Sequence, residues 1–141
     1  MKIFVATSYS SKVNYKTGEV FAQYKAWLDG ILATLEAQGH TVFCALRADQ
    51  YRINDANPAE AFRLDAENIR GSDAVLALLA DDVSAGVQTE IGMALALGKK
   101  VFLAHETDHK LSYFNAAMIR AAAAQEITLP LAETAFSAVL N

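Results

Sequence analysis

Short, mostly apolar runs, separated by segments with helical periodicity, constrain the fold of this 141-residue chain more than any other feature. The runs cover residues 2–6, 40–45, 74–79 and 101–104. They do not alternate apolar with polar residues, as a strand with one solvated face does, so both faces of each strand should be buried. The sequence therefore predicts a parallel sheet covered by helices on both sides.

Helical patterns lie between these runs. Apolar residues at helical spacing begin at residue 19, and Gly39 is a candidate to end that helix. Pro58 suits the first turn of a second helix that runs to about Arg70, with Asn57 as its N-cap. The other predicted elements are an extended connection over residues 46–57, helices over residues 88–97 and 113–123, a fifth strand over residues 126–129 and a last helix from Leu131.

Strands and helices alternate along the whole chain, which indicates an α/β fold. We predict a single doubly wound domain over residues 1–141, a Rossmann-like or flavodoxin-like three-layer sandwich around a mainly parallel five-stranded sheet. In such open sheets, ligands bind beyond the carboxyl ends of the strands, where the strand order reverses. This rule places the expected site in the loops after the first, third and fourth strands.

Charge and cysteine content narrow the possible partners and locations. The formal net charge of −4 argues against binding of a nucleic-acid polymer, which requires clustered Lys and Arg. Cys44 is the only cysteine, so no internal disulfide can form, and a buried thiol behaves as a small apolar group. No apolar run reaches the roughly 18 residues of a membrane span. We expect a cytoplasmic protein that does not bind membranes.

Residues 81–90 join the third strand to a helix and contain two carboxylates, a hydroxyl, a glycine and Glu90. Near a helix start, unpaired amides and the positive end of the helix dipole favour an ionised carboxylate. Glu90 is therefore expected to be ionised at neutral pH, as attack on an anomeric carbon requires. The alternative is that Glu90 only complements the dipole, with Ser84 or Gln88 in a capping box.

Asp65 is a second candidate, because its neighbours Phe62, Leu64 and Ile69 place it near the apolar side of its helix. A carboxylate there is unfavourable unless it is paired with another group or retained for function. A structural and a functional role for Asp65 are equally compatible with the residues.

The polar stretch over residues 7–12 supplies hydroxyls and amides after the first strand, a setting that suits phosphate or ribose but also a solvated turn. It contains neither a dinucleotide fingerprint nor a P-loop. His105 and His109 are four residues apart in a polar loop without a third soft ligand. We predict no metal site there and no cofactor.

The segment from Asp65 to Gly98 resembles the nucleoside 2-deoxyribosyltransferase superfamily, particularly its 2′-deoxynucleoside 5′-monophosphate N-hydrolase branch. The motif is Ser84-Ala85-Gly86-Val87-Gln88-Thr89-Glu90-Ile91-Gly92-Met93-Ala94, preceded by Ser72-Asp73-Ala74-Val75. In that superfamily, a Ser-Asp pair starts the buried strand, and a glycine-containing loop leads into an E-x-G-x-A helix whose glutamate is the nucleophile.

The resemblance implies roles for individual residues. It implies that Glu90 is the nucleophile, that Asp65 is the upstream acid, and that Ser84 and Gly86 lie in the loop that touches the substrate. Thr7 takes the position of a ligand-contacting serine after the first strand. Ser8 would help to hold the sugar or phosphate, and Tyr9 is a candidate for stacking on the base.

The resemblance also implies self-association. Residues 116–120 resemble a segment that the hydrolase branch contributes across a dimer interface, and Asn115 resembles the asparagine that the transferase branch lends to its neighbour. We therefore expect a homodimer or a higher homo-oligomer. Ser10 and Ser11 replace a glycine pair flanked by arginines, so the need for a 5′-phosphate stays open.

These observations predict cleavage of the N-glycosidic bond of a (deoxy)nucleoside or nucleoside 5′-monophosphate through a glutamate nucleophile, with release of the free base to water. The partner is thus a small nucleoside or nucleotide. Deoxyribosyl transfer between nucleobases and a non-catalytic nucleotide-binding or sensing module are the alternatives. A Toll-interleukin-receptor-like NAD glycohydrolase is a third, less well matched by the E-x-G-x-A arrangement.

Overall fold

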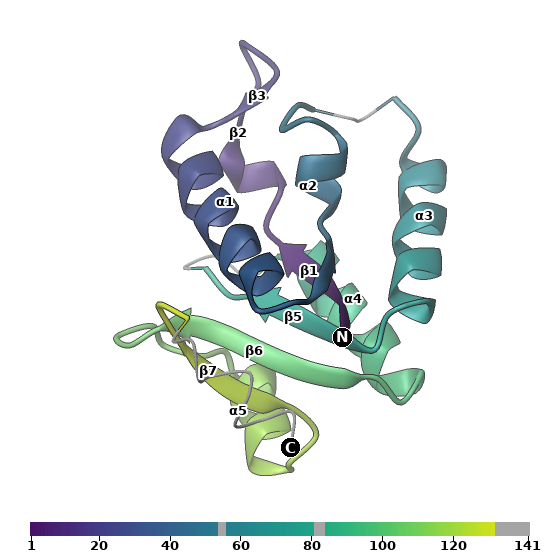
Figure 1. Ribbon diagram of the computed structural model, residues 1–141, viewed down its shortest axis with the longest axis vertical. Coiled ribbons are helices and arrows are strands. Elements are labelled where there is room, and N and C mark those ends of the chain that lie inside the picture. Colours follow the sequence, from purple (N-terminus) through teal and green to yellow (C-terminus); the bar gives the residue numbers. More distant parts are fainter. Residues whose placement is uncertain (54–55, 81–83, 132–141) are drawn as a thin grey trace.

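The computed structural model describes residues 1–53, 56–80 and 84–131, which form a parallel sheet with helices on both faces (Figure 1). The strands of this sheet are β1 (Lys2–Thr7), β4 (Thr41–Phe43), β5 (Ala74–Leu78), β6 (Lys100–Glu106) and β7 (Gln125–Leu129). Their order in the sheet is β4-β1-β5-β6-β7, and every neighbouring pair is parallel. The predicted α/β three-layer sandwich with a five-stranded sheet is confirmed.

The described helices are α1 (Ala22–Ala37), α2 (Ala45–Ala48), α3 (Pro58–Arg70), α4 (Ala85–Ala96) and α5 (Tyr113–Arg120). Local signals fix several of their ends. The side chain of Asn57 accepts a hydrogen bond from the Glu60 amide at 3.1 Å, so it caps α3 as predicted. Gly39 follows α1 with a φ of +86°, a left-handed conformation that glycine adopts without strain. Within the described residues, no helix combines the length and apolar character needed to span a bilayer.

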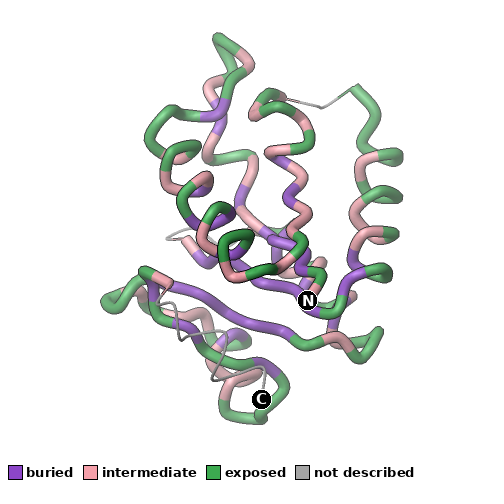
Figure 2. The backbone as a smooth tube through the Cα atoms, viewed as in Figure 1, coloured by how far each residue is buried: buried purple, intermediate pink, exposed green. Residues whose placement is uncertain are grey.

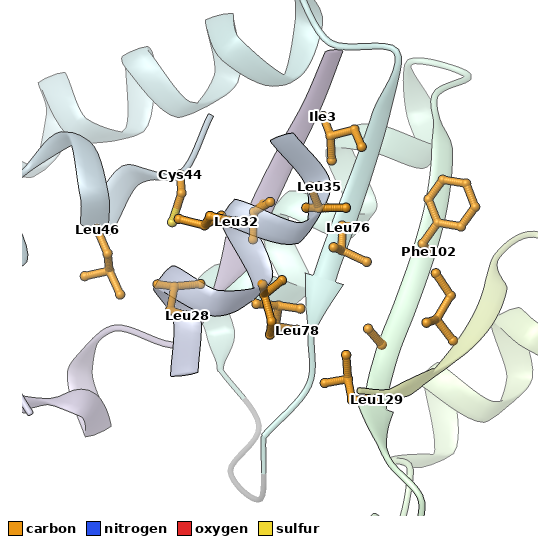
Figure 3. Close-up of a cluster of buried hydrophobic side chains, with 14 of the residues drawn as sticks. Ile3, Leu28, Leu32, Leu35, Cys44, Leu46, Leu76, Leu78, Phe102 and Leu129 are labelled. Carbon is orange, nitrogen blue, oxygen red and sulfur yellow. The ribbon is translucent and has the colours of Figure 1, made fainter. Parts of the chain in front are cut away.

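The two faces of the sheet bury separate apolar clusters. Figure 3 shows one of them, in which Leu28, Leu32 and Leu35 of α1 pack beside side chains of β1 and β5 such as Ile3 and Leu76. The opposite cluster joins alternate residues of the same strands to α3, α4 and the region of α5. Because both faces are covered, β5 is buried along its whole length (Figure 2).

The strand order reverses at β1. From β1 the chain passes to β4 on one side, and then crosses to β5 on the other side. Thr7 pairs with Leu78 at the carboxyl ends of β1 and β5. The crevice that this arrangement opens beyond Thr7 and Leu78 is the place where open α/β sheets bind their ligands.

Several boundaries differ from the sequence prediction, and the strand predicted over residues 40–45 is limited to Thr41–Phe43 because α2 begins at Ala45. The first helix begins at Ala22 instead of residue 19, because Val20 pairs with Val13 in an antiparallel ladder between β3 (Glu19–Val20) and β2 (Val13–Asn14). The connection over residues 46–57 contains α2, which at four residues is too short to leave a period in the sequence. The helix predicted over residues 88–97 begins at Ala85, because Ser84 caps it.

The remaining differences lie at the end of α5 and before α1. Helix α5 ends at Arg120, where residues 113–123 were predicted to be helical, and Ala122 then adopts a φ of +56°, which ends the helix. Before α1, Ser10–Lys12 form a short 3-10 turn. The helix predicted from Leu131 falls outside the described residues.

We expect Leu32→Ala to lower the free energy of unfolding by about 2–5 kcal/mol, because Leu32 is fully buried between α1 and the sheet. Urea unfolding at neutral pH measures this loss. Leu97→Ala is the matched control: Leu97 is 44% exposed, so its loss should stay below about 1 kcal/mol. Equal losses for the two variants would contradict the described packing.

Candidate active site

A cavity of 490 Å³ opens at the carboxyl edge of the sheet, beyond β1 and between α2, α3 and α4. It brings together most of the side chains that the sequence predicted to touch a substrate, although they come from distant parts of the chain. These residues are Thr7, Tyr9, Asp65, Ser84, Gly86 and Glu90. Much of the remaining wall is apolar, and none of the described residues that line the cavity is basic.

Glu90 reaches this cavity from the second turn of α4. The Ser84 hydroxyl accepts a hydrogen bond from the Val87 amide at 3.3 Å and so starts the helix at Ala85, which makes Glu90 its sixth residue. Val87 and Ile91 are buried against the sheet and fix the rotation of the helix about its axis. The neighbouring position 90 is thereby turned towards the cavity.

The expected charge of Glu90 is wrong. The first turn of α4 contains no acidic residue, so the unpaired amides of the helix start do not stabilise a charge on Glu90. Burial, followed by the nearby Asp65 carboxyl, raises the pKa of Glu90 to about 8. Glu90 therefore holds a proton at neutral pH.

Asp65 faces the same cavity from the middle of α3. Burial, followed by the charge of Asp49, raises the pKa of Asp65 to about 6. Arg63, the cation nearest to Asp65 in sequence, does not pair with it. Arg63 instead pairs with Glu60 at 2.6 Å and with Glu67 at 2.5 Å, and these three side chains are about half exposed. Asp65 and Glu90 thus form a pair of carboxyls that desolvation drives towards the neutral form.

Asp49 also lines this cavity, and the sequence prediction missed it. It caps the carboxyl end of α2, inside the segment that was expected to be an extended connection. A single acidic residue in a polar stretch without periodicity carries no signal that separates it from a solvated loop residue. Only the fold brings Asp49 to the same cavity as Asp65.

The hydroxyl-rich loop after β1 divides between two cavities. Thr7 lines the cavity of Glu90, and its hydroxyl is hydrogen-bonded to the hydroxyl of Tyr24 on α1. Ser8 is buried and lies instead in an adjoining cavity of 330 Å³. Successive side chains at a strand end point to opposite faces, which explains why the two residues diverge.

Asn115 lies in the adjoining cavity with Ser8, and Ser84 and Val87 border both hollows. Asn115 is buried in the first turn of α5, which Ser112 caps, and its side-chain oxygen has no hydrogen-bond partner among the described residues. Ser8 and Asn115 are therefore next to the cavity of Glu90 and not in it.

The two histidines singled out in the sequence have structural contacts. His105 is buried, and its Nε2 lies 2.7 Å from the Glu126 carboxylate, while its Nδ1 lies 2.7 Å from the Glu106 carbonyl oxygen. The ring of His109 lies beside that of His105, with 5.7 Å between their centroids. In the part of the chain that the structure describes, no three His, Cys, Asp or Glu side chains are grouped to hold a metal ion.

Comparison with known proteins relates this site to a family. A family model described as nucleoside 2-deoxyribosyltransferase matches residues 17–131 of the chain. No curated protein sequence is similar enough to count as a match.

Several solved structures share the fold. The CMP N-glycosidase BcmB of Clostridium botulinum is 22% identical, and the alignment covers 99% of this chain and 98% of that one with a TM-score of 0.65. A 2-deoxyribosyltransferase of Bacillus psychrosaccharolyticus is 25% identical over 81% of this chain and 79% of that one, with a TM-score of 0.60. The solution structure of BlsM is 21% identical over 92% of this chain and 81% of that one, with a TM-score of 0.72.

We expect Glu90→Gln to stabilise the folded protein at high pH. The pKa of Glu90 is about 8 in the folded protein against 4.5 as its ordinary value. Below pH 4.5 the carboxyl is protonated in both states, and as the pH rises through 8 the wild type loses stability because the unfolded chain ionises first. One pKa unit corresponds to about 1.4 kcal/mol, which limits the gain to about 5 kcal/mol.

Thermal unfolding at pH 4.5 and pH 9 measures this effect. The Tm of Glu90→Gln should exceed that of the wild type by about 3 °C or more at pH 9 and by little at pH 4.5. Glu67→Gln, which removes an exposed carboxylate from α3, is the control and should show no such gain. A gain of equal size at both pH values would mean that the carboxyl is not desolvated.

Proposed function

Because the chain belongs to the nucleoside 2-deoxyribosyltransferase family, we propose that it hydrolyses the N-glycosidic bond of a nucleoside or nucleoside 5′-monophosphate and releases the free base. The family makes it an enzyme of the N-glycosidase and deoxyribosyltransferase type that acts on small nucleosides or nucleotides. The observation that carries the finer proposal is the shared cavity of Glu90 and Asp65 at the carboxyl edge of the sheet.

In the first step, an ionised Glu90 carboxylate attacks C1′ of the sugar while the bond between C1′ and the base nitrogen breaks. The electron pair of that bond leaves with the base, which takes a proton from the Asp65 carboxyl. The product is a glycosyl ester of Glu90, formed through an oxocarbenium-like transition state. Asp65 is left as a carboxylate.

In the second step, water attacks C1′ and gives a proton to the Asp65 carboxylate. The ester bond breaks, and its electron pair returns to Glu90. The sum of the two steps is one substrate and one water consumed, one sugar and one base released, and both carboxyls restored. A second nucleobase in place of water would give transfer instead of hydrolysis.

The remaining residues would hold the substrate. Thr7, Ser84 and Gly86, which line the cavity, would contact the sugar, and Tyr9, which also lines it, would stack on the base. Ser8 and Asn115 would bind a part of the substrate that extends into the adjoining cavity, which shares Ser84 and Val87 with the first one.

We also propose that the protein acts as a homodimer or a higher homo-oligomer. Tyr113 and Phe114 at the start of α5 are 83% and 73% exposed, although such large side chains are usually buried at least in part. They directly precede Asn115 in sequence, so a partner that covers them would lie next to the adjoining cavity. This supports an interface that adjoins the site.

We expect Glu90→Ala to lower the rate of base release by a factor on the order of 10³ or more, because the variant lacks the nucleophile. Chromatography of the free base measures this over a panel of nucleosides and monophosphates, with and without a second base. Glu67→Gln should stay within about twofold of the wild type, since it changes only an exposed ion pair. Base release that needs the second base would identify a transferase.

The covalent intermediate gives a second measurement on the same protein. Mass spectrometry of the quenched wild type should show the sugar on the peptide that contains Glu90, and Glu90→Gln should show none. Unchanged base release by Glu90→Ala, or a sugar adduct on Glu90→Gln, would contradict the proposed nucleophile.

We expect kcat/KM for a nucleoside to follow a bell-shaped pH profile, with limbs near pH 6 and pH 8, where the pKa values of Asp65 and Glu90 lie. Below pH 6 both carboxyls are protonated and no nucleophile is present. Above pH 8 the pair has lost its last proton and no acid is present. An unphosphorylated nucleoside is used because a phosphate itself ionises near pH 6. A rate that only rises through pH 8 would rule out Asp65 as the acid.

A further inference from the structure

The cavity of Glu90 contains one carboxyl more than the proposed mechanism uses. Asp49 lines it together with Asp65 and Glu90, and the described lining residues include no Lys, Arg or His. Phe4, Phe43 and other apolar side chains form much of the wall. Like charges in such surroundings disfavour one another, and together with burial this raises the pKa values of Asp65 and Glu90.

The backbone fixes Asp49 at this place. The Asp49 amide donates to the Ala45 carbonyl at 2.9 Å and closes α2. The next two residues, Gln50 and Tyr51, have φ values of +58° and +57°. This left-handed conformation costs roughly 1–3 kcal/mol for each residue that is not glycine. The Tyr51 amide donates to the Leu46 carbonyl at 2.8 Å, which ties this turn back onto α2.

The turn is also tied to the neighbouring elements. The Tyr51 carbonyl accepts from the Val20 amide of β3 at 2.9 Å, and the Tyr51 hydroxyl donates to the carboxylate of Asp29 on α1. Two strained residues that are held from both sides leave the end of α2 little freedom. Asp49 is therefore presented to the cavity by a rigid turn.

The groups that face Asp65 come from three elements. Asp49 lies at the end of α2, Glu90 on α4 and Tyr9 in the loop after β1, and no described cation lines the space between them. After burial, the charge of Asp49 is the cause that raises the pKa of Asp65, and Asp65 in turn raises the pKa of Glu90. The three carboxyls thus form a chain in which Asp49 acts on the acid and the acid acts on the nucleophile.

We propose that Asp49 is a positioning residue of the active site, whose negative charge keeps the transferable proton on Asp65. This inference rests on the proposed function, in which Asp65 protonates the leaving base. Without the charge of Asp49, Asp65 would lose its proton more readily. The form with a protonated Asp65 and an ionised Glu90 would then be rarer.

Asp49→Asn tests this inference, because it keeps the shape of the side chain and removes the charge. Carbon-13 NMR follows the Asp65 carboxyl, assigned with Asp65→Asn, and its midpoint should fall by about half a pH unit or more. The acidic limb of kcat/KM should move down with it, and kcat should fall about threefold with little change in KM. Asp49→Glu restores the charge and should return the midpoint towards that of the wild type.

Glu67→Gln is the matched control, since it removes a carboxylate two residues from Asp65 on the outer side of α3 and should leave the midpoint in place. An unchanged Asp65 midpoint in Asp49→Asn overturns the inference, even where activity falls. Failure of the proposed function is recognised separately, because it shows as unchanged base release in Glu90→Ala.

Discussion

The reversal of strand order at β1 is the constraint on which the site depends. Because β1 lies between β4 and β5 and is parallel to both, the helices that follow β4 and β5 begin on opposite sides of its carboxyl end. Asp49 comes from the segment after β4 and Glu90 from the helix after β5. Asp65 lies on α3, which packs with α4 on one face of the sheet. One crossover thus gathers three distant carboxyls.

Desolvation then decides how these carboxyls behave. A buried carboxylate without a cationic partner is unfavourable, and a nearby arginine is the usual remedy. Here the arginine closest in sequence to Asp65, Arg63, is held on the outer side of α3 by Glu60 and Glu67. The folded protein consequently keeps Glu90 neutral at neutral pH and raises the pKa of Asp65 to about 6, at a loss of stability at high pH. Such a loss is characteristic of groups retained for chemistry.

Residues with a local signal were predictable from the sequence, and residues placed only by tertiary contacts were not. The buried strands and the cap at Asn57 each leave a pattern within a few neighbouring positions. The predicted apolar setting of Asp65 was wrong in part, because Phe62 and Leu64 are exposed and only Ile69 is buried. Asp49 leaves no such pattern, because α2 is one turn long and the direction of α2 is set by contacts with β3 and α1. Ser8 was grouped with Thr7 by proximity in sequence, but the alternation of side chains separates them.

The start of α4 shows how a small error in a boundary changes the chemistry. A helix that began at residue 88 would place Glu90 in its first turn, where the helix dipole favours the charged form. With Ala85 as the first residue, Glu90 lies beyond that influence and keeps its proton. Under the proposed mechanism, Glu90 must then lose its proton to Asp65 when the substrate binds. A bound base that accepts a hydrogen bond from Asp65 favours the proton on that carboxyl, which leaves Glu90 charged only when a leaving group is in place.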